Sequence, residues 1–277
     1  MKTTILFLLV SIFTINIFSQ ADSVFSVDHS KVTLSTDIIP QWKVQMEVGG
    51  SIWYTEFDYF FLPGSEYESA MTYYNLRINN PSLAFRVGIF KNVEIRLGFV
   101  FVQELSGTIP ERLNYHHTRN GIYSGGPIEA GVKAKLLEES KIFPSTSIKA
   151  DVFIPAGDYY FHMDYVSPVF RLMLQKSISK NFSIGANAGY GWNVYESYTH
   201  KYGSYSVSLN ANVSRKLGAF AEAFSYLQYQ RTPDHRLGAG LNYSFSRNVM
   251  AVVQGGFGIS ERAPDMFASG GIGFMFP

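Results

Sequence analysis

The chain has 277 residues, with 23 Lys and Arg against 22 Asp and Glu, six His and no Cys. The balanced charge leaves no electrostatic footprint for nucleic acid, and the lack of Cys excludes disulfides, thiolate metal sites and a lipidated N-terminal Cys. Aromatic residues reach 16% and Gly stands at 24, a composition that suits alternating membrane strands, in which each polar residue facing the lumen offsets an apolar residue facing lipid.

The first predicted element is a secretory signal peptide over residues 1–21. Lys2 precedes an apolar stretch, and Ser19-Gln20-Ala21 offers a small-x-small cleavage site. A single membrane anchor is the alternative, but the apolar run is nearer to about 14 residues than to the ~20 that cross a bilayer. The mature chain then begins near Asp22. Because the pattern that follows never pauses for a linker, residues 22–277 are expected to form one domain.

Strands are the next predicted elements, because apolar residues alternate with polar ones from Lys43 onward. Val44, Met46 and Val48, for example, alternate with Gln45 and Glu47, which is a strand period and not a helical one. Turn residues divide the chain into an even number of such segments. Twelve strands are expected, over residues 42–55, 72–90, 93–105, 126–138, 144–156, 168–178, 182–194, 203–214, 218–229, 235–246, 249–259 and 267–276.

The connections between these strands alternate between short and long along the whole chain. Barrels of the bacterial outer membrane have short periplasmic turns and long external loops, and both ends of the barrel sequence fall on the short-turn side. The sequence therefore predicts an all-β fold, a 12-stranded antiparallel transmembrane β-barrel in the outer membrane of a Gram-negative bacterium. Phe274 and Phe276 complete the last strand, and such an aromatic end resembles the signal read by the barrel-assembly machinery; Pro277 after it is a departure.

A soluble β-sandwich is the alternative fold, since it too is built from short alternating strands. Its strands typically run about 5–6 residues, whereas the predicted ones are about ten or longer. Trp53, Trp192, Tyr54 and Tyr190 fall near predicted strand ends, where membrane proteins place aromatic girdles in contact with lipid headgroups. These features favour the membrane barrel.

Alternate residues of a strand share one face, which we call a phase. The phase that carries the charges is expected to face the lumen, because lipid tolerates few charges. The opposite phase carries almost none; Leu83, Phe85 and Val87 are typical of it. The lumen candidates, as solute-selecting residues or as structural ion pairs, are Glu47, Arg77, Arg86, Glu94, Arg96, Glu129, Lys133, Lys135, Lys149, Asp151, Arg171, Glu222 and Arg236.

Basic residues outnumber acidic ones in this set by roughly three, which predicts a mild anion preference of an open pore. Barrels of about eight strands are filled by side chains and those of about sixteen hold a water channel, so at twelve an open and a plugged lumen are both possible. Inward Gly residues such as Gly131 and Gly240 would leave room, but Gly also relieves strain in curved strands.

Several segments together resemble the outer-membrane family described as "Putative MetA-pathway of phenol degradation". The resemblance runs from about Ile39 to the C-terminus, and it rests on Ser82–Phe90, Val93–Arg96, Gly126–Lys135, Phe153–Gly157, Glu222 and His235–Gly238. It implies outer-membrane passage of small aromatic or hydrophobic compounds, with no catalytic motif and no cofactor. The matched polar positions Arg86, Glu94, Arg96, Lys133, Glu222 and Arg236 all belong to the predicted lumen phase, where a structural role is favoured over a selective one.

Three other functions remain open from the sequence. An outer-membrane phospholipase would need a Ser, a His and an orienting Asn or Asp on the outer barrel face; Ser225 and His235 could both point outward, but their estimated register separates them by roughly 10 Å. Asn242, moreover, lies on the inward phase.

A metal site at His116-His117, or a calcium site at Asp58, Glu66 and Glu68, lacks recognisable ligand spacing. A plugged structural or surface-recognition barrel is the third possibility, because the long loops 57–71 and 108–124 carry aromatic and charged residues as binding loops do.

Overall fold

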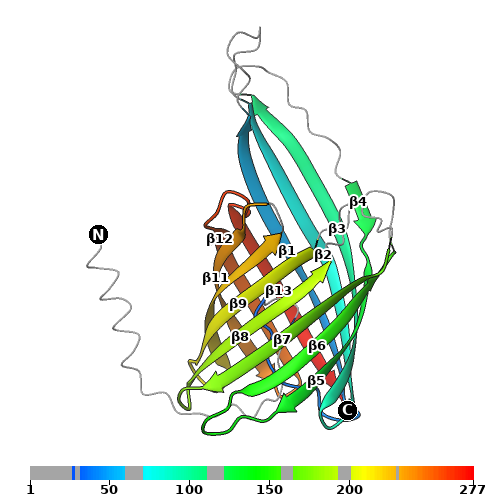
Figure 1. The fold of residues 1–277 in the computed structure, drawn as a ribbon, viewed down its shortest axis with the longest axis vertical. Coiled ribbons are helices and arrows are strands. Elements are labelled where there is room, and N and C mark those ends of the chain that lie inside the picture. The colour runs from blue at the N-terminus through cyan, green and yellow to red at the C-terminus, as the bar shows by residue number, and fades with distance from the viewer. Residues whose placement is uncertain are drawn as a thin grey trace, which may run out of the picture.

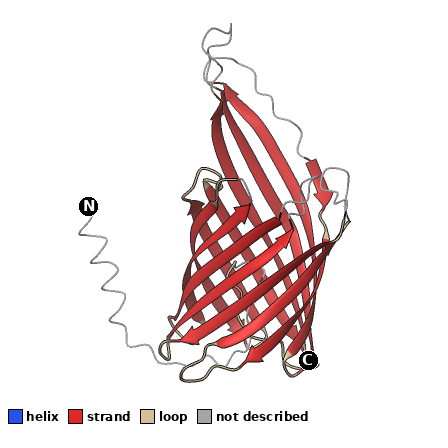
Figure 2. Ribbon diagram, viewed as in Figure 1, coloured by secondary structure: helices blue, strands red, loops and turns tan. Residues whose placement is uncertain are grey.

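The computed structural model describes residues 27–28, 32–59, 71–110, 122–156, 165–192, 201–228 and 231–277. The predicted signal peptide over residues 1–21 lies outside these ranges. All regular structure in them is β-strand (Figure 2), and no helix there is long and apolar enough to cross a membrane.

The strands follow one another around a closed antiparallel barrel (Figure 1). Their bounds are β1 Val44–Tyr59, β2 Met71–Phe90, β3 Val93–Pro110, β4 Ile122–Gly125, β5 Ile128–Leu137, β6 Ser145–Ile154, β7 Ser167–Ser177, β8 Phe182–Trp192, β9 Lys201–Asn212, β10 Leu217–Gln228, β11 Asp234–Ser246, β12 Val249–Gly258 and β13 Met266–Phe276. Strand β13 closes the ring by pairing with β1, from Val44 opposite Phe276 to Tyr54 opposite Met266.

The barrel wall has twelve strand positions, as the sequence predicts, although thirteen strands are labelled. Both β4 and β5 pair with β3, so they occupy one position, interrupted at Gly126-Pro127. Gly126 donates its N–H to the carbonyl oxygen of Val100 at 2.7 Å, whereas Pro127 has no N–H to offer the ladder. The sequence pattern indicated only the β5 part of this position.

Three neighbouring strands project from the barrel (Figure 1), and two of them, β1 and β3, extend further than predicted. Pairing of β1 with β13 ends at Tyr54, but β1 continues beside β2 as far as Tyr59 opposite Met71. Strand β2 in turn pairs with β3 up to Pro110. A three-stranded sheet therefore extends past the rim at the end of the barrel where the long loops lie, which we name the long-loop end; the opposite end is the short-turn end.

Polarity is reversed relative to a soluble protein. Phe85, Leu97 and Val132 point outward and are 40%, 49% and 45% exposed, whereas Glu94 and Lys133 on the same group of strands are fully buried. A soluble domain buries its large apolar side chains and exposes its charges. An apolar outer face and a charged interior are instead the arrangement of a barrel surrounded by lipid.

Candidate functional site: the lumen and the N-terminal segment

The short-turn end of the lumen is occupied by part of the chain itself. The described residues 27–28 and 32–43, which we call the N-terminal segment, precede β1; they run inside the barrel wall as far as Ile39, whereas Gln41 and Trp42 are exposed. Val27, Thr36 and Ile39 are 1–2% exposed. Val27 packs with Phe220, Met250 and Val252 of the wall in a small buried apolar cluster.

Side chains of the wall satisfy the backbone of the N-terminal segment. Glu222 accepts the N–H of Thr33 at 2.9 Å, and Glu94 accepts the N–H of Ile39 at 2.8 Å. The hydroxyl of Ser147 donates to the carbonyl oxygen of Thr36 at 2.7 Å. Buried backbone groups need such partners, and because the segment is not a strand of the barrel, polar side chains supply them. The sequence did not predict this arrangement, since hydrogen bonds of this kind leave no periodic pattern.

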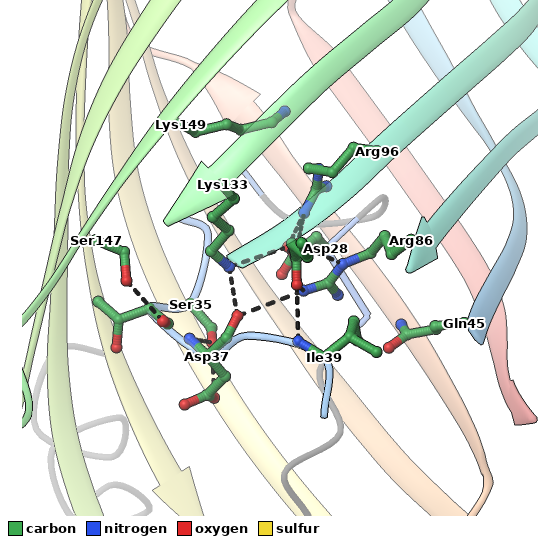
Figure 3. Close-up of polar contacts among 12 residues, drawn as sticks. Asp28, Ser35, Asp37, Ile39, Gln45, Arg86, Arg96, Lys133, Ser147 and Lys149 are labelled. Carbon is green, nitrogen blue, oxygen red and sulfur yellow. Dashed lines mark hydrogen bonds and ion pairs between the residues drawn. The ribbon is translucent and has the colours of Figure 1, made fainter. Parts of the chain in front are cut away.

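A buried ionic cluster joins the N-terminal segment to four adjacent wall strands, β1, β2, β3 and β5, and Figure 3 shows its members Asp28, Arg86, Arg96 and Lys133. Its members are Asp28, Glu47, Arg86, Glu94, Arg96 and Lys133. Arg86 reaches Glu94 at 3.0 Å and Glu47 at 3.3 Å, while Arg96 reaches Glu94 at 2.8 Å. Each of these six side chains is at most 9% exposed.

Asp28 provides the carboxylate that the N-terminal segment brings to this cluster. Its Oδ2 atom lies 2.9 Å from Arg96 Nη1, 3.4 Å from Arg86 Nη2 and 3.7 Å from Lys133 Nζ. Burial by itself would raise the pKa of the Asp28 carboxyl, but Arg86, Lys133 and Arg96 outweigh that effect and hold the pKa well below its usual range. Asp28 is therefore ionised at neutral pH, and the cluster has three cations and three anions.

The other lumen candidates fall into separate groups and not into one ring. Lys149 pairs with Glu129 at 2.8 Å and with Asp151 at 2.9 Å. Arg236 pairs with Asp234 nearer the long-loop end, and Glu222, besides holding Thr33, accepts a hydrogen bond from Gln254. The remaining three are placed as follows: Arg77 opposite Glu104, Arg171 beside the carbonyl oxygen of Val32 at 3.5 Å, and Lys135 with Glu138 at the short-turn end.

Cavities lie on both sides of the N-terminal segment. The upper cavity, about 380 Å³, is lined by aromatic side chains together with Ser82, Glu129 and Arg236; the aromatic ones include Trp53, Phe153, Phe224, Tyr226 and Phe267. It shares Trp53, Asn79, Tyr226 and Arg236 with a cavity of about 500 Å³ nearer the long-loop end.

The lower cavity, about 280 Å³, lies at the short-turn end and is lined by Val27, Asp28, Thr33 and Leu34 among others. Val32 lines the upper cavity while Thr33 and Leu34 line the lower one. The N-terminal segment therefore separates two hollow parts of one lumen.

Gly88 sets how closely the wall and the N-terminal segment can approach. Its carbonyl oxygen accepts the N–H of Trp42 at 2.7 Å, and its N–H donates to Lys43 at 3.1 Å. A Cβ atom at this position would overlap the carbonyl oxygens of Ile39 and Pro40. These are backbone atoms on both sides, so neither can move aside without breaking the contact.

Gly88→Ala is expected to destabilise the barrel by about 1–3 kcal/mol, the usual cost of overpacking a tight site. The midpoint of urea unfolding in detergent would measure it, and limited proteolysis would report earlier cleavage of the N-terminal segment. Gly255→Ala is the matched control, because its Cβ would have no neighbour nearer than 3.8 Å. Equal midpoints for the two variants would contradict the assigned contact.

Ser225 and His235 require a correction. The expected separation of roughly 10 Å is wrong: the two residues are directly opposite each other on β10 and β11, and Ser225 Oγ lies 2.5 Å from His235 Nδ1. Both belong to the outward phase, but Ser225 is only 3% exposed. The ring of Tyr205 lies beside His235, with 6.5 Å between centroids.

Metal ligands are not grouped in the described residues. No three His, Cys, Asp or Glu side chains in those ranges are placed to hold an ion. The candidates His116, His117, Glu66 and Glu68 lie outside the described residues, and Asp58 is described only as part of the backbone of β1.

Comparison with solved structures finds the same architecture at low sequence identity. An outer membrane channel from Pseudomonas putida F1 is 11% identical, with 91% of this chain and 99% of that chain covered and a TM-score of 0.60. The transport unit of the autotransporter AIDA-I from Escherichia coli is 10% identical, with 93% and 95% covered and a TM-score of 0.51. The deltaS2S3 mutant of the TodX monoaromatic hydrocarbon channel is 10% identical, with 86% and 90% covered and a TM-score of 0.50. At these identities the likeness concerns the fold.

Family assignment comes from the sequence. No curated protein matches it, but the model of one protein family matches residues 64–276. This range includes every segment on which the resemblance was based, and the twelve-stranded barrel with an apolar outer face agrees with it. The chain belongs to the family described as "Putative MetA-pathway of phenol degradation".

Proposed function

We propose that this protein is an outer-membrane channel for passive passage of small molecules, with aromatic or hydrophobic compounds as the expected solutes. The observation that carries the proposal is a closed barrel whose interior is hollow on both sides of the N-terminal segment. Filled barrels of fewer strands have no such spaces. One structural neighbour is a monoaromatic hydrocarbon channel, and the aromatic lining of the upper cavity suits a solute of that kind.

The orientation follows from the loops. In outer-membrane barrels the short turns are periplasmic, so the N-terminal segment would face the periplasm and the upper cavity would face outward. A solute would enter between the long loops, pass the aromatic lining and meet the N-terminal segment as the narrowest part. Lipid surrounds the wall, and the barrel-assembly machinery would insert the chain from the periplasm.

Single-channel recording in a planar bilayer under a potassium chloride gradient tests this function. Discrete current steps from the refolded protein would support a water-filled path, and the reversal potential would show any preference for anions. A correctly folded barrel that stays silent, both intact and without its N-terminal segment, would overturn the proposal.

The lumen charges serve mainly to hold the wall and the N-terminal segment together in this proposal. In the ionic cluster around Asp28, and in the group of Lys149 with Glu129 and Asp151, each charged side chain lies 2.8–3.7 Å from an opposite charge. Charges paired at this distance project a weaker field into the lumen than isolated ones do. Any preference for anions should therefore be modest and local.

A surface-recognition barrel is the second candidate function, and the projecting sheet favours it. Strands β1, β2 and β3 continue past the last residue pair between β1 and β13, which places their tips outside the membrane in the proposed orientation. Loss of binding to a cell-surface partner or phage after deletion of residues 57–71, in a barrel without conductance, would favour this function over a channel.

We further propose that the protein is not an enzyme, and the Ser225–His235 pair tests this directly. Although the two are hydrogen bonded, the imidazole nitrogen involved is Nδ1, so the nitrogen that an Asn or Asp would orient in a triad is already in use. In the described residues, no carboxylate or amide is recorded as a partner of His235.

Ser225→Ala is expected to lower stability by about 1 kcal/mol, the net value of a typical hydrogen bond, and to leave phospholipid hydrolysis at the background rate. A fluorogenic phospholipid in mixed micelles would measure hydrolysis, with Ser244→Ala as a control serine near the short-turn end of β11. Hydrolysis by the unmodified protein that Ser225→Ala abolishes would instead establish a lipolytic site.

A further inference from the structure

Three wall cations converge on a carboxylate that does not belong to the wall. Arg86 of β2, Arg96 of β3 and Lys133 of β5 all lie within 3.7 Å of the Oδ2 atom of Asp28. These strands are neighbours in the barrel, so their side chains form a preformed group. Asp28 reaches it from the N-terminal segment (Figure 3).

Without Asp28, the wall part of the cluster would be unbalanced. Glu47 and Glu94 are the wall carboxylates that pair with Arg86, which leaves three cations against two anions. An uncompensated charge in a buried position is costly. The carboxylates of the adjacent group, Glu129 and Asp151, are paired with Lys149, and Asp28 is the carboxylate that contacts Arg86, Arg96 and Lys133 together.

We infer that Arg86, Arg96 and Lys133 form a binding site for the carboxylate of a small organic anion, and that Asp28 occupies this site from within the chain. Guanidinium groups match carboxylates in geometry and form strong charge-assisted hydrogen bonds with them. A solute carboxylate that enters the site competes with Asp28 and thereby loosens the N-terminal segment. This inference rests on the proposed function and narrows the solute class to organic carboxylates.

The upper cavity approaches this site along β3. Gly98 lines that cavity, and Arg96 is the preceding inward position on β3, because side chains two residues apart share a face. The aromatic side chains Trp53, Phe153 and Phe224 could surround an apolar body while its carboxylate pointed toward Arg96. Asp28 itself also lines the lower cavity, so a displaced carboxylate has space on the periplasmic side.

Other contacts of the segment remain after loss of Asp28, among them the hydrogen bond from Lys133 Nζ to the carbonyl oxygen of Asp37 at 2.7 Å. Thr33 and Ile39 are held through backbone N–H groups, at 2.9 and 2.8 Å from Glu222 and Glu94. Competition at Asp28 removes the ion pairs of the segment with Arg86, Arg96 and Lys133 together, because they share one oxygen atom. One bound anion can therefore remove all three ion pairs of the N-terminal segment at once.

Thiol labelling of the N-terminal segment tests the inference. Because the chain has no Cys, an introduced cysteine is the only thiol that can react. Thr36 is 1% exposed, so in the variant Thr36→Cys a water-soluble maleimide should react only when the segment loosens. Benzoate is the probe and benzamide its uncharged analogue. Lys91→Cys, in the exposed turn between β2 and β3, is the matched control for reagent effects.

Benzoate should accelerate labelling at Thr36→Cys several-fold and saturably, while benzamide should not, and neither should change labelling at Lys91→Cys. Adding Asp28→Asn should raise the basal rate and lower the half-effective benzoate concentration by about tenfold, equal to ~1.4 kcal/mol. Adding Arg96→Gln should abolish the benzoate response. If either variant fails to fold, the titration of the Asp28- and Arg96-containing protein still decides the question.

Equal effects of benzoate and benzamide, or no effect of either, would overturn the carboxylate site. Single-channel recording separates this failure from failure of the proposed function. A barrel that conducts but does not respond to benzoate refutes only the site, whereas a folded barrel that never conducts, with or without its N-terminal segment, refutes the channel itself.

Discussion

A chain that begins at Ile38 is expected to carry several times more current per channel than a chain that begins at Val27. The longer protein retains the N-terminal segment between the two cavities, whereas the shorter one lacks the residues that separate them. Thr33, Leu34 and Thr36 are all buried inside the barrel, so their removal leaves space that water can fill. Single-channel conductance in planar bilayers would measure the difference.

The chain that begins at Val27 is the control, and it differs from the shorter chain only by residues 27–37. Both chains lack the residues before Val27, and both keep Trp42 and Lys43, which bond to Gly88 and Pro40. Unequal conductance therefore reports the N-terminal segment and not the length of the chain. Equal conductance would mean that current passes by another route.

A folding check accompanies this truncation, because Glu222 loses the N–H of Thr33 that it accepts, and the wall cations lose Asp28, whereas Glu94 keeps the N–H of Ile39. Circular dichroism and the electrophoretic shift on heating would show whether the barrel has formed. If it has not, the full-length variant Thr33→Pro with Asp28→Asn weakens the same segment without removing it. Proline lacks the N–H that Glu222 accepts, and asparagine lacks the charge of Asp28, so this variant should also conduct more than the unmodified chain.

The barrel itself could be predicted because its wall repeats one rule. Alternation of apolar and polar residues sets the inward and outward phase of each strand, and alternation of loop lengths orders the strands. Residues 93–96 illustrate this, since Val93 and Ile95 face outward while Glu94 and Arg96 belong to the buried cluster. Neither rule depends on the register between neighbouring strands, so the twelve strand positions can be predicted from the sequence alone.

Register across a loop is harder to predict. Ser225 and His235 were expected to be apart by three residues, but they are direct partners on β10 and β11. Which residues lie opposite each other depends on how many residues each strand contributes before the turn. Alternation does not give that number, because it shows which face of the sheet a residue is on but not its position along the neighbouring strand. The projecting ends of β1 and β3, at Tyr59 and Pro110, were also missed, whereas the predicted start of β2 at residue 72 is within one residue of Met71.

The N-terminal segment could not be predicted because its partners are scattered along the chain. Thr33 bonds to Glu222 and Ile39 to Glu94, contacts that span 189 and 55 residues of sequence. The charge count of the lumen set gave no signal for it, because the wall carboxylates Glu104, Glu138 and Asp234 lie beside the three extra cations.

Arg86 provides the second large effect: Arg86→Leu is expected to lower the free energy of unfolding by about 3–5 kcal/mol, the usual cost of removing one partner from a buried ion-pair network. Arg86 contacts Asp28, Glu47 and Glu94, so its loss leaves three buried carboxylates with fewer cations. Urea unfolding in detergent, followed by tryptophan fluorescence, would measure the change.

Arg86→Lys and Lys176→Ala complete this experiment. Lysine keeps the charge of Arg86 but not its planar fork, so Arg86→Lys should fall between Arg86→Leu and the unmodified chain. Lys176 pairs with Glu139 at 3.4 Å near the short-turn end, where both side chains are about one-third exposed (34% and 31%), and exposed pairs contribute about 0–1 kcal/mol. If Arg86→Leu folds as stably as Lys176→Ala but shifts the reversal potential, Arg86 selects ions and does not hold the barrel together.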